Sequence, residues 1–192
     1  KSNDTEIRDI IKLLKGIKRP AMVAALLQNP IKKNWAFNTL EDIKVFENEG
    51  YEIWGQVSCR PLTMEFTMKE PYMLEGLNSW REYMLQNSIE GKKNILKSNE
   101  FRKKVIEEIL DTTKNKLFIG NWEKIKLLKS SKSILNKHLG KNIYEISKYY
   151  NKEPFDWLLD NAVEEGMNDL FTAELLNSDD EQVEKLLKHK HA

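Results

Sequence analysis

The residues best suited to chemistry in this sequence stand where a strand-like stretch ends. Residues Tyr51 to Val57 are predicted to form a strand, and Ser58, Cys59 and Arg60 follow it directly. A guanidinium at the end of a strand suits two-point binding of a carboxylate. The thiol of Cys59 is a candidate nucleophile or metal ligand. However, no histidine lies near it in the sequence, so we expect it to be a packed apolar neighbour.

A second polar pair ends the other predicted strand, Ala21 to Leu27. Gln28 and Asn29 follow this apolar run, and α/β sheets place ligands at the carboxyl ends of their strands. Together with Ser58 and Arg60 they form the predicted substrate-binding set. Each has a structural alternative: the two amides can satisfy backbone groups at a turn, and Arg60 can form an ion pair with Glu65 or Glu70.

The three histidines give weaker signals. His189 and His191 have the His-x-His spacing that is used for zinc on a strand. They follow a predicted helix near the end of the chain, and no third ligand is evident, so we expect them to be solvated. His138 lies in a polar turn before Gly140 and is expected to be exposed.

Aromatic residues and methionines are concentrated around the Arg60 segment. Core packing is the ordinary role of such residues, and a wall for an apolar acyl group is the more specific alternative. The cluster consists of Trp54, Met64, Phe66, Met68, Tyr72, Met73 and Trp80.

Two parts of the chain, with different sequence patterns, must position these residues. Residues 1–59 alternate between helix and strand, with helices predicted from about Ile7 to Leu14 and from Thr39 to Glu49. The unbroken apolar run Ala21 to Leu27 indicates a strand buried on both faces. Short links between a strand, a helix and a second strand favour a βαβ crossover and a parallel sheet.

Residues 60–192 are predicted to be mainly helical. Trp122 to Leu128 alternates apolar and charged residues and is expected to be a short, half-exposed strand. No linker separates the halves, so the sequence predicts a single domain over 1–192. The predicted helices of this half are Asn78 to Gln86, Ser98 to Asp111, Asn142 to Tyr150, Pro154 to Glu165 and Asp179 to Lys188.

Composition narrows the function classes. The 192 residues include 31 Lys and Arg against 30 Asp and Glu, a net charge of +1, which disfavours a dedicated nucleic-acid binder. A single cysteine argues against an oxidising compartment, and no apolar run approaches the length of a membrane span. We therefore expect a cytoplasmic protein with a small-molecule ligand, and association into a homo-oligomer is compatible with the sequence.

Several segments, in order, resemble one family. They are ALLQNP (25–30), GQVSCRPL (55–62), WEKIKLL (122–128), GKNIYEI (140–146), PFDWLLD (154–160) with EEG (164–166), NSD (177–179) and LLKHKH (186–191). This series is similar to the N-acyl-D-amino-acid deacylase (D-aminoacylase) branch of the amidohydrolase superfamily, from about Pro20 to the last residue.

The resemblance implies a (β/α)8 barrel with its active site at the carboxyl ends of the strands. In this family one or two zinc ions activate a water that attacks the amide carbonyl of an N-acyl amino acid, often of D configuration. Such a barrel takes about 250 residues. The sequence thus predicts a partial, TIM-like α/β barrel of two or three parallel strands with a large helical region.

The family's metal ligands and catalytic residue are not matched here. Its His-x-His strand would precede Lys1, and its SDAGAH motif, with the catalytic aspartate, would follow Ala192. Where many members place a metal-binding histidine, this chain has Gln28 and Asn29, and amides are poor zinc ligands. We expect no metal to be bound by this chain itself, although zinc is the cofactor of the family.

Two function classes follow. The first is a segment of an amidohydrolase, inactive by itself, in which Arg60 favours an acidic or carboxylate-bearing substrate. The second is a non-catalytic α/β interaction module derived from such an enzyme.

Overall fold

The computed structural model describes residues 7–17, 19–114, 116–164 and 166–192. They form two compact units: unit 1 comprises residues up to Leu62 together with Leu176–Ala192, and unit 2 comprises Thr63–Leu175. The last 17 residues therefore return to unit 1, next to the strand ends that precede Leu62. About 50% of the chain is helical and 13% is strand, so the fold is mixed α/β, as predicted.

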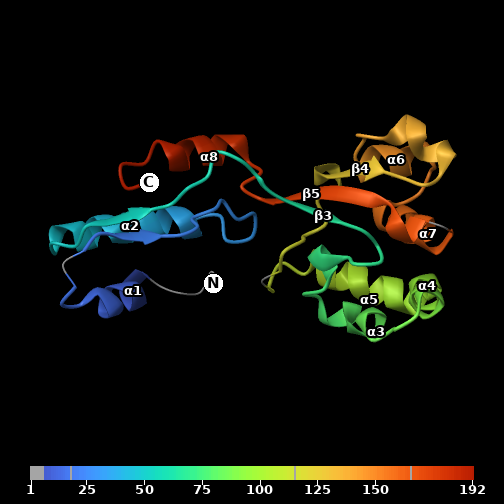
Figure 1. The fold of residues 1–192 in the computed structure, drawn as a ribbon, viewed down its shortest axis with the longest axis horizontal. Coiled ribbons are helices and arrows are strands. Elements are labelled where there is room, and N and C mark those ends of the chain that lie inside the picture. The colour runs from blue at the N-terminus through green and yellow to red at the C-terminus, as the bar shows by residue number, and fades with distance from the viewer. Residues whose placement is uncertain (1–6, 18, 115, 165) are drawn as a thin grey trace. The chain divides into compact units, whose positions relative to one another are not determined.

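Unit 1 contains a parallel pair of strands. β1 and β2 pair in the register Ala21↔Ile53, Met22↔Trp54 and Val23↔Gly55, which confirms the predicted crossover. In unit 1 the described residues form this two-stranded sheet, and the described part of the chain forms no closed barrel. The elements of unit 1 are α1 (Ile7–Leu14), β1 (Ala21–Val23), α2 (Trp35–Asn48), β2 (Ile53–Gly55) and α8 (Asp180–Leu187) (Figure 1).

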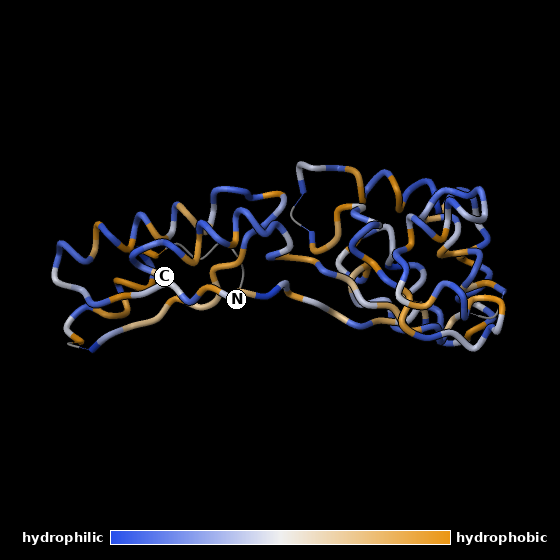
Figure 2. The backbone as a smooth tube through the Cα atoms, turned by 90° about the horizontal axis from the view of Figure 1, so that it is seen from above, coloured by the Kyte–Doolittle hydropathy of each residue, from blue (hydrophilic) through white to orange (hydrophobic). Residues whose placement is uncertain are grey.

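One face of this sheet is covered and the other is open. Val23 and Ile53 are buried in a core with Leu40 and Ile43 of α2. On the opposite face Met22 is 63% exposed. The prediction of a first strand buried on both faces is therefore wrong, because helices pack on one side of the pair only. Figure 2 shows hydrophobic and hydrophilic residues interspersed along the backbone of the described chain.

Unit 2 is built around a three-stranded sheet of order β3-β5-β4. β4 and β5 are antiparallel, with Ile125 opposite Ala173 and Leu127 opposite Phe171. In Figure 1, α3, α4 and α5 lie on one side of β5, and β4 and α6 lie on the other. The strands are β3 (Leu62–Phe66), β4 (Ile125–Lys129) and β5 (Leu170–Leu176).

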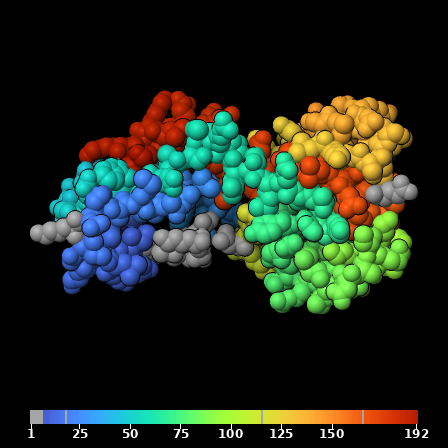
Figure 3. Space-filling model, in the orientation of Figure 1, coloured from blue at the N-terminus to red at the C-terminus, as the bar shows by residue number. Residues whose placement is uncertain are grey.

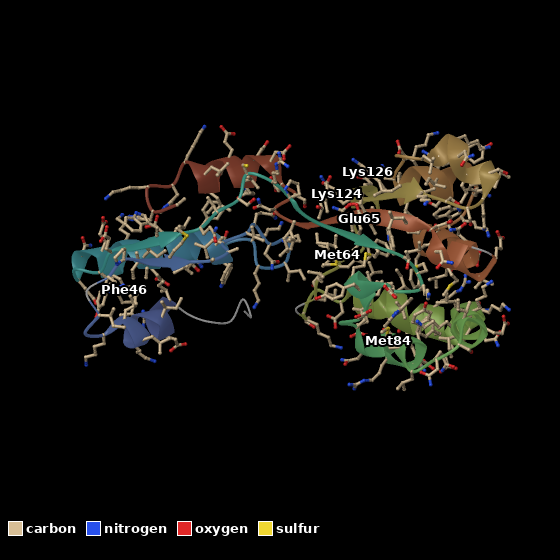
Figure 4. All side chains as sticks on the ribbon, viewed as in Figure 1. Phe46, Met64, Glu65, Met84, Lys124 and Lys126 are labelled. Carbon is tan, nitrogen blue, oxygen red and sulfur yellow. The ribbon has the colours of Figure 1, made fainter. Side chains whose placement is uncertain are left out.

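The strands of unit 2 show the period-two pattern of a half-buried sheet. Ile125 and Leu127 are fully buried, whereas the side chains of Lys124 and Lys126 extend outward (Figure 4). Lys124 Nζ lies 3.1 Å from Glu174 Oε2 on β5. The sequence predicts β4 with a start three residues too early, and it predicts neither β3 nor β5.

The helices of unit 2 follow the prediction more closely. Ser98 caps α5 by accepting a hydrogen bond from the backbone N–H of Phe101 at 3.3 Å, and Asn142 and Glu145 form a capping box at the start of α6. Glu165, the predicted end of α7, lies outside the described residues. Figure 3 shows these helices packed closely. They are α3 (Arg81–Met84), α4 (Ile89–Lys97), α5 (Asn99–Leu110), α6 (Ile143–Tyr149) and α7 (Pro154–Glu164).

Among the described residues, none of the helices has both the length and the apolar character that crossing a membrane requires.

Candidate functional site

A buried asparagine joins the segments that follow β1 and β2 in unit 1. Asn177 is 1% exposed and has a φ of 59°, a left-handed conformation that asparagine tolerates better than most residues. Its Nδ2 donates to the carbonyl oxygens of Ser58 at 2.6 Å and Arg60 at 2.9 Å. The strand ends are therefore fixed by one amide side chain.

Asn177 also holds the end of the β1 segment. Its Oδ1 accepts a hydrogen bond from the backbone N–H of Gln28 at 3.2 Å, and its own backbone N–H donates to the Gln28 carbonyl at 2.9 Å. The Gln28 side-chain Oε1 accepts from the backbone N–H of Ser178 at 3.2 Å. The structure thus brings Gln28, Ser58 and Arg60 into one hydrogen-bonded network, at the strand edge that the sequence predicts.

Asn29 organises the turn that leaves this edge. Its Oδ1 accepts hydrogen bonds from the backbone N–H groups of Ile31 at 2.8 Å and Lys32 at 3.0 Å. Both predicted amides therefore use their oxygens on backbone groups, as the structural alternative proposes. Within the described part of the chain, the Nδ2 of Asn29 and the Nε2 of Gln28 donate to no partner.

The Ser58 hydroxyl closes a tight turn. It accepts from the Arg60 backbone N–H and donates to the Arg60 carbonyl, both at 3.2 Å. Because the carbonyls of Ser58 and Arg60 turn inward to Asn177, the side chains of Cys59 and Arg60 extend into solvent, and both residues are exposed. The expectation that Cys59 is a packed neighbour is therefore wrong.

Among the described residues of unit 1, the guanidinium of Arg60 makes no ion pair with a carboxylate. The exposed guanidinium of Arg60 and the N–H₂ groups of Gln28 and Asn29, two residues that are each 5% exposed, are donors without a general base. Such a set can bind a carboxylate or an amide carbonyl, but it cannot by itself activate water or a nucleophile.

The described residues do not fit a zinc ion. They contain no group of three His, Cys, Asp or Glu side chains placed to hold a metal. At the strand edge itself the side chains are amides, which are poor zinc ligands. We therefore assign no catalytic step to a metal on this chain.

The two C-terminal histidines lie against α2 rather than on a strand. His189 Nε2 is 3.1 Å from Glu41 Oε1, and His191 Nε2 is 3.7 Å from Glu47 Oε2. The hydrogen bond with His189, helped by Lys44, lowers the pKa of Glu41. His191 is 4% exposed, so the prediction of a solvated pair fails for this residue.

His138 is also buried, at 1% exposure, contrary to the prediction. Its ring packs 4.8 Å from the Tyr149 ring and 5.5 Å from the Tyr150 ring, between centroids. Neither ring nitrogen has a hydrogen-bond partner among the residues that the structure describes. Burial, and then the charges of Lys141 and Lys137, lower its pKa.

The aromatic and methionine cluster does not form a wall at the strand edge. Phe66, Met68, Met73 and Trp80 are buried in the core of unit 2, whereas Trp54 belongs to unit 1 and is 40% exposed. For these four residues core packing, the ordinary role, is confirmed. Asn177, in contrast, was not among the predicted site residues. The sequence feature that could have indicated it is an asparagine directly after an apolar run, because asparagine tolerates the left-handed conformation of a turn there.

No protein-family model matches the chain, and no similar curated protein or solved structure was found.

Proposed function

We propose that the chain is the substrate-binding part of an amidohydrolase that acts on N-acyl amino acids, with Arg60 as the anchor for a substrate carboxylate. The observation that carries this proposal is the exposed, ion-pair-free guanidinium of Arg60 at the carboxyl end of a parallel strand pair. The segment around it is fixed by the buried Asn177.

The chemistry of the edge agrees with such a substrate. An N-acyl amino acid presents one carboxylate and one amide carbonyl, and both are acceptors. Arg60 is suited to the carboxylate in two-point fashion, and the N–H₂ groups of Gln28 and Asn29 are suited to an amide oxygen. In the proposed enzyme a zinc ion would supply the activated water, and its ligands would be residues other than those described.

Binding to the 192-residue chain tests this proposal. We expect N-acetyl-D-glutamate to bind more tightly than N-acetyl-D-leucine in isothermal titration calorimetry. Arg60→Met should weaken N-acetyl-D-glutamate binding about tenfold or more, the usual effect of losing a charge-assisted bond. Arg8→Met removes an exposed arginine on α1 of the same unit and should leave binding unchanged.

A non-catalytic interaction module remains the second candidate, favoured by the absence of a metal group among the described residues. It predicts that neither N-acyl amino acid binds and that Arg60→Met changes nothing. Equal binding of both ligands to the parent chain and to Arg60→Met would also exclude Arg60 as the anchor.

A further inference from the structure

Unit 2 contains a small cavity that belongs to none of the segments discussed so far. Its volume is about 180 Å³, and its apolar walls include Leu135, Tyr150 and Trp157. This volume is below the roughly 300–1,000 Å³ of sites for drug-sized ligands. A cavity of this size suits one small molecule.

The polar lining of this cavity holds two charges of each sign. Lys132 Nζ lies 2.8 Å from Glu164 Oε2, and Lys152 Nζ lies 2.5 Å from Asp160 Oδ2. All four side chains line the cavity. A ligand with only a negative charge would be repelled by two carboxylates there, and a ligand with only a positive charge would be repelled by two ammonium groups. A ligand that carries both charges can pair with a lysine and with a carboxylate.

Asp160 remains ionised in this setting. Burial opposes its charge, but the hydrogen bonds from Lys152 and Arg102 outweigh that effect and lower its pKa. Arg102 also binds Asp156, with Nη1 3.1 Å from Oδ1, and its Nη2 lies 2.6 Å from Asp160 Oδ1. Because Arg102 anchors Asp160 from the other side, this carboxylate keeps its place when Lys152 turns to a ligand.

One polar atom beside the cavity lacks a partner. The Tyr150 hydroxyl is buried and makes no hydrogen bond to the described residues, although buried hydroxyls are nearly always bonded. Tyr150 is one of the residues that line the cavity, and its hydroxyl is the donor or acceptor that a polar ligand there would have to reach.

We propose that this cavity binds a free α-amino acid in its zwitterionic form. The ammonium of Lys152 meets the ligand carboxylate, Asp160 or Glu164 meets its α-ammonium group, and an apolar side chain packs against Trp157 and Leu135. The inference depends on unit 2 alone and stands whether or not the chain belongs to an amidohydrolase.

Calorimetric titration of the 192-residue chain with leucine and with two derivatives tests the proposal. Leucine should bind with a dissociation constant of about 1 mM, ordinary for so small a ligand. N-acetyl-leucine lacks the α-ammonium group and leucine amide lacks the carboxylate, so each should bind at least about tenfold more weakly. D- and L-leucine are compared to define the stereochemistry.

Two variants assign the binding to the cavity. Tyr150→Phe keeps the ring and removes only the hydroxyl, and Lys152→Gln removes one charge while Arg102 still holds Asp160. Each should weaken leucine binding about tenfold. Lys104→Gln, which removes an exposed lysine paired with Glu100 on α5, should not. Arg60→Met should also leave leucine binding unchanged, which separates this site from the strand edge of unit 1.

The proposal is overturned if leucine produces no heat up to about 10 mM, ten times the expected dissociation constant, with a chain whose circular dichroism shows it folded. It is equally overturned if N-acetyl-leucine and leucine amide bind as well as leucine. Unchanged binding to folded Tyr150→Phe and Lys152→Gln would also place the ligand elsewhere.

Discussion

At the scale of single residues, Asn177 has the most consequential position in unit 1. Its side chain makes three hydrogen bonds, to the backbone of Gln28, Ser58 and Arg60. A buried backbone group without a partner is unfavourable. Removing this amide takes away the Asn177 partner of the Ser58 carbonyl and of the Gln28 N–H, and it leaves the Arg60 carbonyl with only the Ser58 hydroxyl as a donor. The proposed binding edge therefore depends on a residue whose side chain is buried and does not face a ligand.

Asn177→Gly tests this dependence. Glycine accepts the positive φ, so the change removes the side-chain bonds without adding backbone strain. We expect the free energy of unfolding to fall by about 2–4 kcal/mol, measured by urea denaturation.

Asn151→Gly is the matched control, because Asn151 has a φ of 53° and is exposed, with no side-chain hydrogen bond in the described chain. It should change stability by less than about 1 kcal/mol. Equal effects of the two substitutions would show that backbone conformation, rather than the amide bonds, determines the loss.

His138 predicts a pH dependence of stability. Burial and nearby lysines lower its pKa below the ordinary 6.5, so the unfolded chain takes up a proton at a higher pH than the folded one. The stability that the neutral, buried His138 contributes to the folded state is therefore complete above about pH 6.5. It is lost as the pH falls from there toward the lowered pKa. In His138→Leu this acid-induced loss should be smaller.

Denaturation of the parent and of His138→Leu at pH 8 and pH 5 measures the difference. At pH 8 the two should have similar stability, because removing two unsatisfied nitrogens offsets the lost ring contacts. A parallel decline of both proteins between the two pH values would show that other groups cause the acid sensitivity.

The predicted site residues show what a sequence can indicate at this scale. Gln28 and Arg60 follow β1 and β2 along the chain, as expected of polar residues after apolar runs. The exposure of Cys59 was not foreseen, because it depends on carbonyls that turn inward to Asn177, 118 positions later by the residue numbers. His138 was misjudged for a similar reason, since its neighbours Tyr149 and Tyr150 come from another segment.

At the scale of elements, Gly55 allows β2 to pack closely against α2. A Cβ at this position would lie 2.5 Å from Leu26 Cδ1 and 2.6 Å from Leu40 Cδ2. The backbone N–H of Gly55 also donates to the carbonyl of His191 at 2.7 Å. The strand therefore has Leu40 of α2 and Leu26 of the segment after β1 on its face, and the C-terminal segment beside it.

Gly55→Ala should lower the free energy of unfolding by about 1–3 kcal/mol, because the added methyl group overpacks the core. Gly76→Ala is the control, since a Cβ there would meet nothing within 4 Å and its φ is not positive. That change should be neutral or stabilise by up to about 1 kcal/mol. A loss at Gly55 no larger than at Gly76 would contradict the close packing.

The elements themselves were predictable to different degrees. α5 behind Ser98 and α8 behind Asp179 were found within a residue or two because their start signals are local. α4, which is capped by Ser88, was not predicted. β3 and β5 were missed because they depend on pairing across unit 2, and strand preference is set largely by such contacts. β1 is shorter than the apolar run Ala21 to Leu27 that predicted it. Within that run only Val23 and Leu26 are buried in the core.

At the scale of the whole molecule, the parallel pair of unit 1 is unusual in having an open face. Parallel sheets are normally covered on both faces, yet Met22 is 63% and Trp54 40% exposed on neighbouring strands. Exposed apolar patches and unpaired strand edges favour association. In a complete barrel the same face would point toward the other strands.

We therefore expect the 192-residue chain to associate as its concentration rises, through this face of unit 1. Met22→Lys places a charge on the face without disturbing the buried side, so it should shift the weight-average mass toward that of a monomer in sedimentation equilibrium. Leu85→Lys, at a residue of unit 2 that is 72% exposed, adds the same charge elsewhere and should leave association unchanged. If the parent chain stays monomeric at every concentration, or if the two lysine substitutions have equal effects, the open face does not mediate association. Either result would count against the interpretation of unit 1 as part of a barrel.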